Sequence, residues 1–430
     1  MAKPRVFIST DLKLTSEEKD DAQSLIHALL YQDKINIVGI AGTASKWGHQ
    51  NGRVSDIDAI IDVYGKDLAK LQAHASGFKS VAELKAISHQ GATAVAPSAG
   101  FSSATASSKA IVAEAKKAAA AGETLNVLTW GGETDMAQAL HDDPSIAAHV
   151  RFFNIGAQDT AAKSYLLKNF KGAFDMWVDN MSTFRGMYGT PTAKKIITGW
   201  HETNAKGHGA LGDYFAKLSG DIFNVSGVKM GDSPTVLRFL SGDQNDPTKE
   251  SWGGEFRKVS EGYYTDRTDS AFEWGATNGA MTIYEDRAAW LSSLAQRFDW
   301  LKSTTAPLPP VAPSNPVETG PVTDDALNIR VSGDPGAGGL DPIVRILVDG
   351  VHKGSFKVTA DHADGAWQTI AIDGNWKAGV NHKIEVKFYE KTSSQAVYLD
   401  SVTLNGDTNG TDVTMLKSGN KLYWLGDDAL

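Results

Sequence analysis

A proline-rich segment divides this chain of 430 residues into two parts with different sequence patterns. Six of the 14 prolines lie within residues 303–322. Proline fixes its own backbone torsion and cannot donate a main-chain hydrogen bond, so such a run favours a semi-rigid linker over a packed element. We therefore expect two separately folded parts, residues 1–302 and residues 323–430. Each part is long enough to bury a hydrophobic core.

The first part alternates short apolar runs with longer stretches of helical periodicity. Short apolar runs predict buried strands, and apolar positions three and four residues apart predict helices. Strands are expected at 6–8, 35–41, 125–130 and 152–155, and helices at 22–31, 104–121, 134–141 and 284–300. A strand, a helix and a second strand within about 40 residues form a βαβ unit. The pattern predicts an α/β domain with a mostly parallel sheet flanked by helices.

Polar residues follow several of the predicted strands. Asp11, Thr43, Gly131 and Gln158 each come directly after an apolar run, and Trp47 lies shortly after the second run. In open α/β sheets the ligand binds beyond the carboxyl ends of the strands. We therefore expect one pocket to collect these residues, with Trp47 stacking on a sugar or a base.

The second part has a different texture, with short strands that mostly alternate apolar and polar residues. Strands are expected at 327–331, 343–348, 367–372, 383–388 and 396–404. Turn-forming pairs such as Asp349-Gly350 and Asn405-Gly406 separate them. About 100 residues of short strands with regular turns predict an all-β sandwich.

The overall composition excludes several classes of protein. The chain has no cysteine, which excludes disulfides, thiolate metal sites and a cysteine nucleophile. A formal net charge of −9 gives no basic footprint for a nucleic-acid polymer. No apolar run of about 18 residues predicts a membrane span. No apolar signal region follows the N-terminus, so we expect an extracellular or surface location reached without a signal peptide, or alternatively a cytoplasmic one.

Three aspartates lie between the first predicted strand and the first predicted helix. They are Asp11, Asp20 and Asp21. Carboxylate oxygens on a loop suit calcium, which takes about six to eight oxygen ligands. The alternative is that the acidic run from Glu17 to Asp21 is a first helical turn favoured by the helix dipole. The residues by themselves leave both interpretations open.

The aspartate segment resembles the N-terminal motif of the nucleoside hydrolases. About residues 4–300 are more closely similar to the nucleoside-hydrolase-like domain of the cellulose-binding protein Sde182 family. The matching pieces follow in chain order: Thr10-Asp11, Asp20 to Leu25, Ile60 to Lys66, Ala82 to Lys85, Trp130 to Gly132, Ala137 to Leu140, Ser182 to Gly186, Gly231 to Pro234 and Trp252 to Gly254.

This resemblance implies a role for each residue of a calcium pocket. It makes Asp11 and Asp21 calcium ligands, and it makes Asp11 the base that activates water. It assigns a sugar hydroxyl to Asp20, a main-chain carbonyl ligand to Thr134, and the last ligand to Asp232. In such a site calcium orients the sugar ring, and a carboxylate takes a proton from water beside the anomeric carbon.

The sequence also departs from the nucleoside hydrolases at three places. Ser9 stands where their motif has its first aspartate, and Gly231 stands where some have a proton-donating histidine. Eight residues separate Asp11 from Asp20, whereas the spacing in nucleoside hydrolases is shorter. There is no clear counterpart of the segment that binds the base. The leaving group is therefore open.

Four further residues are weaker candidates for the pocket. Gln158 and Asp159 follow a strand end and line the pocket in one interpretation, whereas in the other Asp159 is a loop-turn residue. Arg185 would bind an anionic or polyhydroxy ligand, or form a structural ion pair. His208, in a glycine-rich loop, is a candidate to protonate the leaving group.

Residues 323–415 resemble calcium-dependent, xylan-binding carbohydrate-binding modules. The matching pieces are Val331 to Asp334, Asp341 to Val344, Val348 to Gly350, Trp367-Gln368, His382 to Phe388 and Val397 to Val402. The metal loop of these modules corresponds to residues 389–396, where only Glu390 keeps a carboxylate. The alternative is a β-sandwich used for attachment or assembly.

Taken together, the two parts predict a calcium-dependent hydrolase of an N- or O-glycosidic bond with a targeting module. Its ligand would be a carbohydrate or nucleoside-like small molecule, and the module would bind a polysaccharide. A homo-oligomer is expected from the resemblance to nucleoside hydrolases. One alternative is a non-catalytic, calcium-dependent glycan-binding protein for adhesion or a particle surface. Another is an intracellular nucleoside-salvage enzyme, with which the second part agrees poorly.

Overall fold

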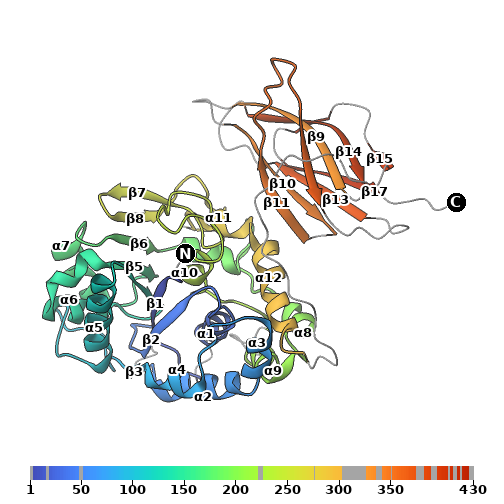
Figure 1. The fold of residues 1–430 in the computed structure, drawn as a ribbon. Helices are drawn as coiled ribbons and strands as arrows, with labels where there is room; N and C mark the ends of the chain where they lie inside the picture. The colour runs from blue at the N-terminus through green and yellow to red at the C-terminus, as the bar shows by residue number, and fades with distance from the viewer. Residues whose placement is uncertain are drawn as a thin grey trace. The chain divides into compact units, whose positions relative to one another are not determined.

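The computed structural model contains two compact units, Met1–Pro310 and Val311–Leu430 (Figure 1). The division falls inside the predicted linker, 303–322, which lies outside the described residues. The structure describes residues 3–15, 19–47, 52–220, 226–275, 277–302, 326–335, 341–349, 351–373, 382–388, 395–404, 407–409, 414–416 and 419–425.

The first unit is built on one eight-stranded sheet with the order β3-β2-β1-β4-β5-β6-β8-β7. Its neighbouring strands are parallel except for β7 and β8, which are antiparallel. The strands are β1 (Arg5–Thr10), β2 (Asn36–Gly42), β3 (Ser88–Gln90), β4 (Leu125–Thr129), β5 (Val150–Ile155), β6 (Met176–Asn180), β7 (Phe256–Ser260) and β8 (Tyr263–Asp266). The predicted mostly parallel sheet is confirmed.

Helices cover both faces of this sheet, and each face has its own hydrophobic core. Helices α5, α6 and α7 pack on one face, and α1, α2, α9 and α12 pack on the other (Figure 1). The helices are α1 (Asp20–Leu30), α2 (Val54–Gly65), α3 (Leu68–His74), α4 (Val81–Ala86), α5 (Ala106–Ala120), α6 (Thr134–Asp142), η1 (Pro144–His149), α7 (Thr160–Phe170), η2 (Thr183–Met187), α8 (Trp200–Asn204), α9 (Gly209–Ser219), α10 (Pro234–Leu237), α11 (Ala280–Tyr284) and α12 (Arg287–Asp299).

One predicted helix differs from the structure. The sequence pattern predicts a single helix over 284–300, but α11 ends at Tyr284 and α12 begins at Arg287. The side chain of Arg287 donates hydrogen bonds to the carbonyls of Gly186 and Gly189. This contact ties the start of α12 to segment η2, which is distant in sequence, so helical periodicity could not locate the break.

The carboxyl edge of the sheet is packed so closely that glycine is required at two positions. A Cβ on Gly131 would lie 2.8 Å from the main-chain nitrogen of Asp11, and a Cβ on Gly52 would lie 2.3 Å from the carbonyl oxygen of Thr43. Because real Cβ atoms do not approach other atoms so closely, neither position could carry a larger residue without a shift. The ends of β1, β2 and β4 therefore meet in one place.

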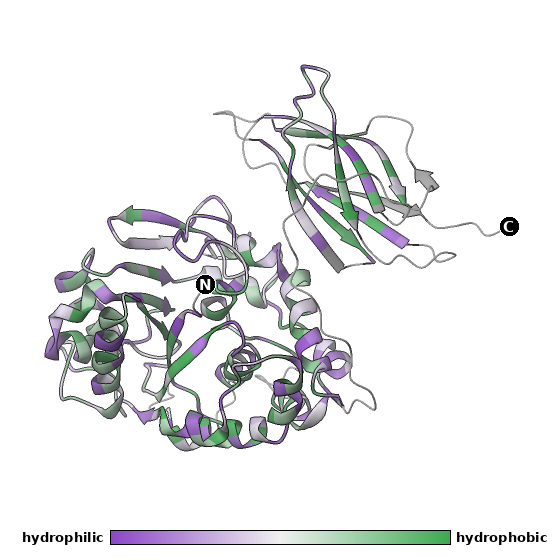
Figure 2. Cartoon of the chain, in the orientation of Figure 1, coloured by the Kyte–Doolittle hydropathy of each residue, from purple (hydrophilic) through white to green (hydrophobic). Residues whose placement is uncertain are grey.

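The second unit consists of two antiparallel sheets, which confirms the predicted β-sandwich fold. One sheet has the order β11-β10-β13-β17, and the other has the order β12-β9-β14-β15 with β16 also paired to β14. The strands are β9 (Ala326–Asp334), β10 (Ile343–Val348), β11 (Val351–Lys357), β12 (Gln368–Asp373), β13 (His382–Phe388), β14 (Ala396–Leu404), β15 (Asp407–Asn409), β16 (Thr414–Leu416) and β17 (Gly419–Leu425). Apolar and polar residues alternate along several of these strands (Figure 2).

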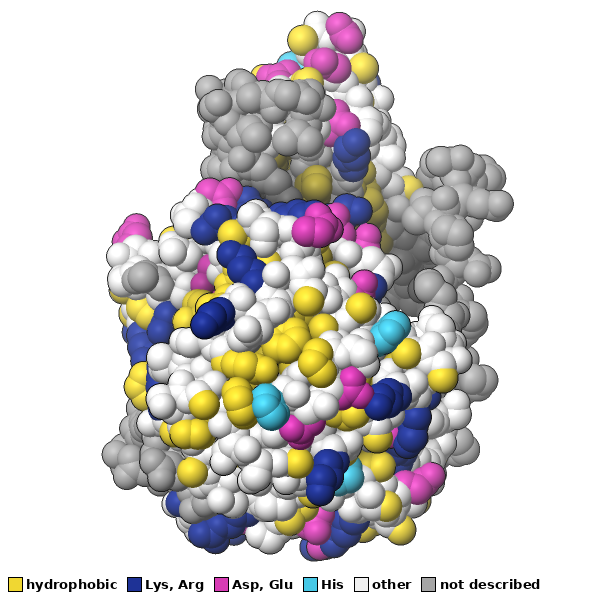
Figure 3. Space-filling view, turned by 90° about the vertical axis from the view of Figure 1, so that its left-hand side faces the viewer, with side chains coloured by type: hydrophobic (Ala, Val, Ile, Leu, Met, Phe, Trp, Pro, Cys, Tyr) yellow, Lys and Arg dark blue, Asp and Glu magenta, His cyan; other side chains and the backbone are white. Residues whose placement is uncertain are grey.

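Two features of the described residues concern the surface: the length of the helices and the distribution of charged side chains on one face. None of the helices in the described part of the chain is long and apolar enough to cross a membrane. On the face seen in Figure 3, basic and acidic side chains are interspersed around a central group of hydrophobic side chains. Among the described residues on that face, the basic side chains therefore do not form one extended area.

Candidate functional site

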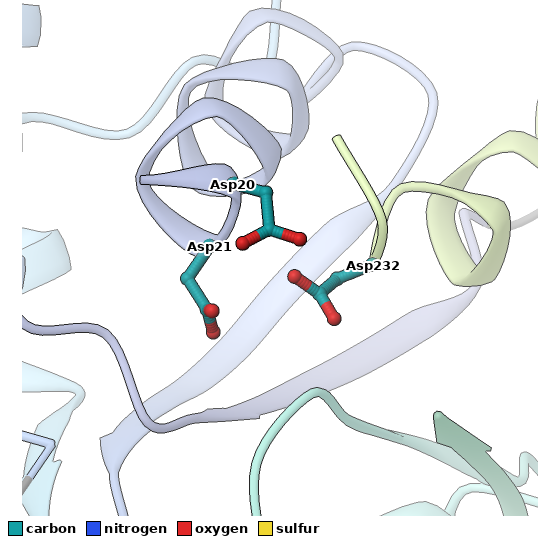
Figure 4. A group of neighbouring side chains, drawn as sticks. All are labelled: Asp20, Asp21 and Asp232. Atoms are coloured by element: carbon teal, nitrogen blue, oxygen red, sulfur yellow. The ribbon is translucent and has the colours of Figure 1, made fainter. Parts of the chain in front are cut away.

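Three carboxylates converge at the carboxyl edge of the sheet (Figure 4). Asp20 and Asp21 are the first two residues of α1, and Asp232 lies in the loop before α10. Each offers one oxygen atom, and these atoms all lie within 4.8 Å of one another. The first turn of a helix favours acidic residues because its free N–H groups carry partial positive charge. Because Asp20 and Asp21 lie in this first turn, both of their side chains come close to Asp232.

Burial makes this group of carboxylates electrostatically unfavourable in the absence of a cation. Burial raises the pKa of Asp20 and Asp21, and the charges of Asp232 and Asp11 raise both further. Burial, followed by the charge of Asp11, also raises the pKa of Asp232. A bound cation would favour the charged forms of all these groups.

Two oxygen atoms in the group have no hydrogen-bond partner. They are Oδ1 of Asp20 and Oδ2 of Asp232, both buried, and neither has a partner in the described part of the chain. Buried polar atoms almost always have a hydrogen-bond partner, so an oxygen without one (an orphan oxygen) indicates a site for a ligand. Carboxylate oxygens are the ligands that hard cations such as Ca²⁺ prefer. The residues present therefore fit a cation site.

Asp11 lies beside this group rather than within it. It follows β1, is 3% exposed, and is close enough for its charge to raise the pKa of each of the three carboxylates. The preceding residue, Thr10, donates a hydrogen bond from Oγ1 to Oδ1 of Asp21. The end of β1 thus positions both the predicted base and one predicted metal ligand.

The long spacing between Asp11 and Asp20 does not separate the aspartates. The main-chain N–H of Leu14 donates to Asp56 on α2 at 3.1 Å, and Lys19 Nζ donates to the carbonyl of Leu14 at 3.0 Å. These bonds fix the loop on both sides of residues 16–18, which lie outside the described residues. Leu14, in the described part of this loop, therefore contacts α2, and α1 begins at the carboxylate group.

Thr43, Thr134 and Gln158 lie at the same edge of the sheet. Thr43 is fully buried, and its main-chain nitrogen donates to Thr10 at 2.8 Å. Thr134 begins α6 and donates from Oγ1 to Asp159 at 2.5 Å. Gln158 donates from Nε2 to the carbonyl of Trp130. The side-chain contacts of Thr134 and Gln158 hold neighbouring loops together, and their roles toward a ligand stay predictions.

Asp159 acts as a helix cap in the structure. Its Oδ1 accepts from the main-chain nitrogens of Ala161 and Ala162, both at 3.1 Å, at the start of α7. Its Oδ2 accepts from Ala96 N at 2.7 Å and from Thr134. Both oxygens therefore have protein partners, and a substrate contact would have to be additional to these.

Arg185 and Trp47 lie around the site rather than among the carboxylates. Arg185 is a hydrogen-bond partner of Tyr188, and the pKa of Tyr188 is raised by burial and by the charge of Asp20. Tyr188 is thus close enough to Asp20 to be affected by its charge, and Arg185 contacts Tyr188. Trp47 is 63% exposed and is the last described residue before residues 48–51.

The structure does not bring His208 to the carboxylates. Its Nδ1 lies 3.6 Å from Asp299 Oδ1, and the neighbouring Gly209 packs against the carboxylate of Asp67. Asp67 follows the C-terminus of α2, whereas the N-terminus of α2 lies at the site. Helix α2 has 12 residues, which corresponds to about 18 Å. This placement does not support a proton-donor role for His208.

Lys229 is the principal residue that sequence reasoning missed. It is 9% exposed, and its Nζ lies 3.2 Å from Oδ2 of Asp20. Gln23 on α1 accepts from the main-chain nitrogens of Lys229 at 2.9 Å and Met230 at 3.2 Å, and Met230 has a positive φ of 49°. The sequence signal was only a lysine three positions before Asp232, which does not distinguish it from a surface lysine.

Comparison with known families matches both units. Residues 5–256 match the family model of cellulose-binding Sde182, nucleoside hydrolase-like domain. Residues 326–416 match that of the Ca-dependent, xylan-binding carbohydrate-binding module. A search of curated proteins finds no match.

Among the solved structures that match, the first one named here has a TM-score above 0.5 and shows the fold. A nucleoside hydrolase-related hypothetical protein from Saccharophagus degradans, associated with carbohydrate metabolism, is 18% identical with a TM-score of 0.57, covering 99% of this chain and 100% of that chain. A plant nucleoside hydrolase, PpNRh1, is 13% identical with a TM-score of 0.40, covering 70% of this chain and 100% of its own. The module vCBM60, in complex with galactobiose, is 17% identical with a TM-score of 0.18, covering 24% and 98%.

Proposed function

The chain belongs to the cellulose-binding Sde182 family with a nucleoside hydrolase-like domain, and from that premise we propose that it is a calcium-dependent glycosidic hydrolase. The bond would be N- or O-glycosidic. A nucleoside hydrolase-like domain joined to a match for a xylan-binding module indicates a protein associated with carbohydrate. The module would bring the hydrolase to a polysaccharide and raise its effective concentration there.

The observation that carries the proposal is the convergence of the buried Asp20 and Asp232 with the half-buried Asp21, together with the two orphan oxygens. In the proposed site Asp11, Asp21, Asp232 and the main-chain carbonyl of Thr134 would hold calcium. When bound, calcium would supply a positive centre that binds two vicinal hydroxyls of a sugar. Asp20 is part of the same group of carboxylates, where it would contribute a ligand oxygen or accept a hydrogen bond from a sugar hydroxyl.

The remaining chemistry would come from the side chains of this chain. Asp11 would accept a proton from the attacking water, as the family resemblance implies, and its closeness to the three carboxylates supports this role. Lys229 would hold Asp20 in place through their ion pair. Burial of the group would exclude bulk water and strengthen these electrostatic interactions.

The test is the release of reducing sugar by the full-length protein with calcium, on nucleosides and on plant oligosaccharides. Asp11→Asn should lower turnover by about 100-fold or more, since a positioned base contributes about that much. Calcium affinity, measured by calorimetry, should fall much less. If Asp11→Asn releases reducing sugar as fast as the wild type, Asp11 is not the base.

A non-catalytic, calcium-dependent glycan-binding protein is the second candidate function. It is favoured by Gly231, which stands where some nucleoside hydrolases have a proton-donating histidine. A Cβ there would lie 2.7 Å from Oδ2 of Asp20, so a side chain would require Asp20 to shift. This candidate predicts calcium and glycan binding with no release from any substrate. Calorimetry with calcium and oligosaccharides, run beside the release assay, separates the two.

The module has its own test. The family resemblance predicts that it binds xylan in a calcium-dependent manner, although its metal loop, including Glu390, falls mostly outside the described residues. Retardation of the full-length protein in gels containing soluble xylan, with and without a chelator, measures both properties. Retardation that a chelator leaves unchanged would contradict calcium dependence. A homo-oligomer and an extracellular location stay predictions.

A further inference from the structure

Lys229 places a positive charge at the edge of the proposed calcium site. Its Nζ lies 3.2 Å from Oδ2 of Asp20. The other oxygen of the same carboxylate, Oδ1, is buried and has no hydrogen-bond partner in the described part of the chain. Asp20 therefore has one oxygen on the ammonium group of the lysine, and its second oxygen can contribute to a cation site with Asp21 and Asp232.

The backbone of Lys229 is held by the helix that carries two of the carboxylates. Gln23, which is fully buried on α1, accepts through Oε1 from the main-chain nitrogen of Lys229 at 2.9 Å and from that of Met230 at 3.2 Å. The same helix begins with Asp20 and Asp21. The lysine and the two aspartates are therefore positioned relative to one another by a single element.

The side chain of Lys229 is also enclosed. It is 11% exposed, and its Nζ lies 5.6 Å from the ring centroid of the buried Tyr188, which is within the range of a cation–π contact. A lysine at the surface can turn its ammonium group into solvent when a cation binds nearby. Lys229 is bounded by Asp20 and Tyr188, so we expect its charge to stay beside the site when the cation is bound.

A calcium ion in this site would lie close to the ammonium group. Calcium binds oxygen at about 2.3–2.6 Å, so an ion on Oδ1 of Asp20 would lie within about 8 Å of Nζ of Lys229, which contacts the other oxygen of that carboxylate. Two positive charges at this separation repel each other, more strongly in a buried site than in water. The affinity of calcium sites depends on the charge of their ligands, and Lys229 offsets one of these negative charges.

We propose that Lys229 sets the calcium affinity of this site by opposing the bound ion, so that the site fills only where calcium is abundant. The lysine thus acts as an internal competitor of calcium for the charge of Asp20. Activity that depends on calcium would then be regulated by the calcium concentration around the protein. This inference rests on the part of the proposed function that assigns calcium to these carboxylates, and it does not depend on hydrolysis.

The experiment is calorimetric titration of the full-length, calcium-free protein with calcium chloride at neutral pH. Lys229→Met should bind calcium at least about tenfold more tightly than the wild type, because it removes the opposing charge. Lys229→Gln should also bind more tightly, whereas Lys229→Arg keeps the charge and should not. Lys258→Met, at an exposed lysine of β7, is the matched control and should bind as the wild type does. Asp232→Asn identifies the binding step of this site, which separates it from any calcium bound by the second unit.

Equal or weaker calcium binding by the two neutral variants would overturn the proposal, and so would tighter binding by Lys229→Arg, which would point to packing instead of charge. If Lys229→Met does not fold without calcium, Lys229→Gln serves instead, since its amide can still donate to Asp20. No calcium binding by the wild type or by any variant would overturn both this proposal and the calcium site. The expected shift in affinity without any hydrolysis would support this proposal and contradict only the proposed reaction.

Discussion

At the scale of single residues, Lys229 is a fixed internal cation within the group of carboxylates. Its Nζ lies 3.2 Å from Asp20, and burial lowers its pKa to about 8 while the charges of Asp232 and Asp11 oppose that shift. One ammonium group offsets only part of the charge of three or four carboxylates. The protein and a bound cation would therefore share the task of neutralising this site.

Replacing this lysine should make folding depend more strongly on calcium. Lys229→Met leaves Asp20 and Asp232 buried with one cation fewer, so without calcium we expect a loss of about 3–5 kcal/mol in the free energy of unfolding. Calcium should restore a large part of it. Urea unfolding with a chelator measures the loss, and urea unfolding with calcium measures the recovery. Lys258→Met, at an exposed lysine, is the matched control. A chelated variant as stable as wild type would contradict the expectation.

His27 should make the first unit sensitive to mild acid. Burial, followed by the charge of Arg297, lowers its pKa from 6.5 to about 3, so below pH 6.5 the unfolded chain binds a proton that the folded chain does not. Its contribution to stability is complete above pH 6.5 and falls by about 1.4 kcal/mol per pH unit toward pH 3. Urea unfolding between pH 7.5 and 5 should show a shallower slope for His27→Gln. Equal slopes would rule His27 out as the cause.

At the scale of elements, Asp159 connects three segments at the edge of the sheet. It caps α7, accepts from Ala96 N at 2.7 Å and accepts from Thr134 at the start of α6. Loops that carry predicted ligands are therefore held by Asp159, for which the sequence left two interpretations open, a pocket residue or a loop-turn residue. Sequence position alone could not show that both of its oxygens face protein donors.

Loss of this cap should destabilise the fold. Asp159→Ala removes a helix cap and leaves Ala96 N unsatisfied, for which we expect a loss of about 2–4 kcal/mol in urea unfolding. Asp159→Asn keeps one acceptor and should lose less. Asp143→Ala, which removes the partly exposed cap of η1, is the control and should have a smaller effect. A lower affinity for sugar in Asp159→Asn at unchanged stability would instead support a substrate contact.

At the scale of the whole molecule, two units with separate cores are joined by a proline-rich segment. Each core consists only of residues of its own unit. Domains with separate cores commonly unfold in separate transitions. A ligand that binds one unit should then shift that unit's transition alone.

Calcium should raise the unfolding temperature of the first unit. Binding at 100 times the dissociation constant stabilises a protein by about 2.7 kcal/mol. Scanning calorimetry of the full-length protein with calcium and with a chelator measures the shift, and Asp232→Asn should abolish the part that belongs to the first unit. A shift that persists unchanged in Asp232→Asn would place the calcium elsewhere, including in the second unit.

The sequence by itself determined the fold class of each unit. It also identified the two aspartates at the start of α1 as candidate site residues. Buried parallel strands are continuous apolar runs, and helix periodicity is local, so the residue pattern alone locates β1, β4, β5 and α5. Only the tertiary structure decided the placement of Lys229 and the distance of His208 from the carboxylates. These depend on which distant segments meet, and contacts between distant segments leave no local pattern.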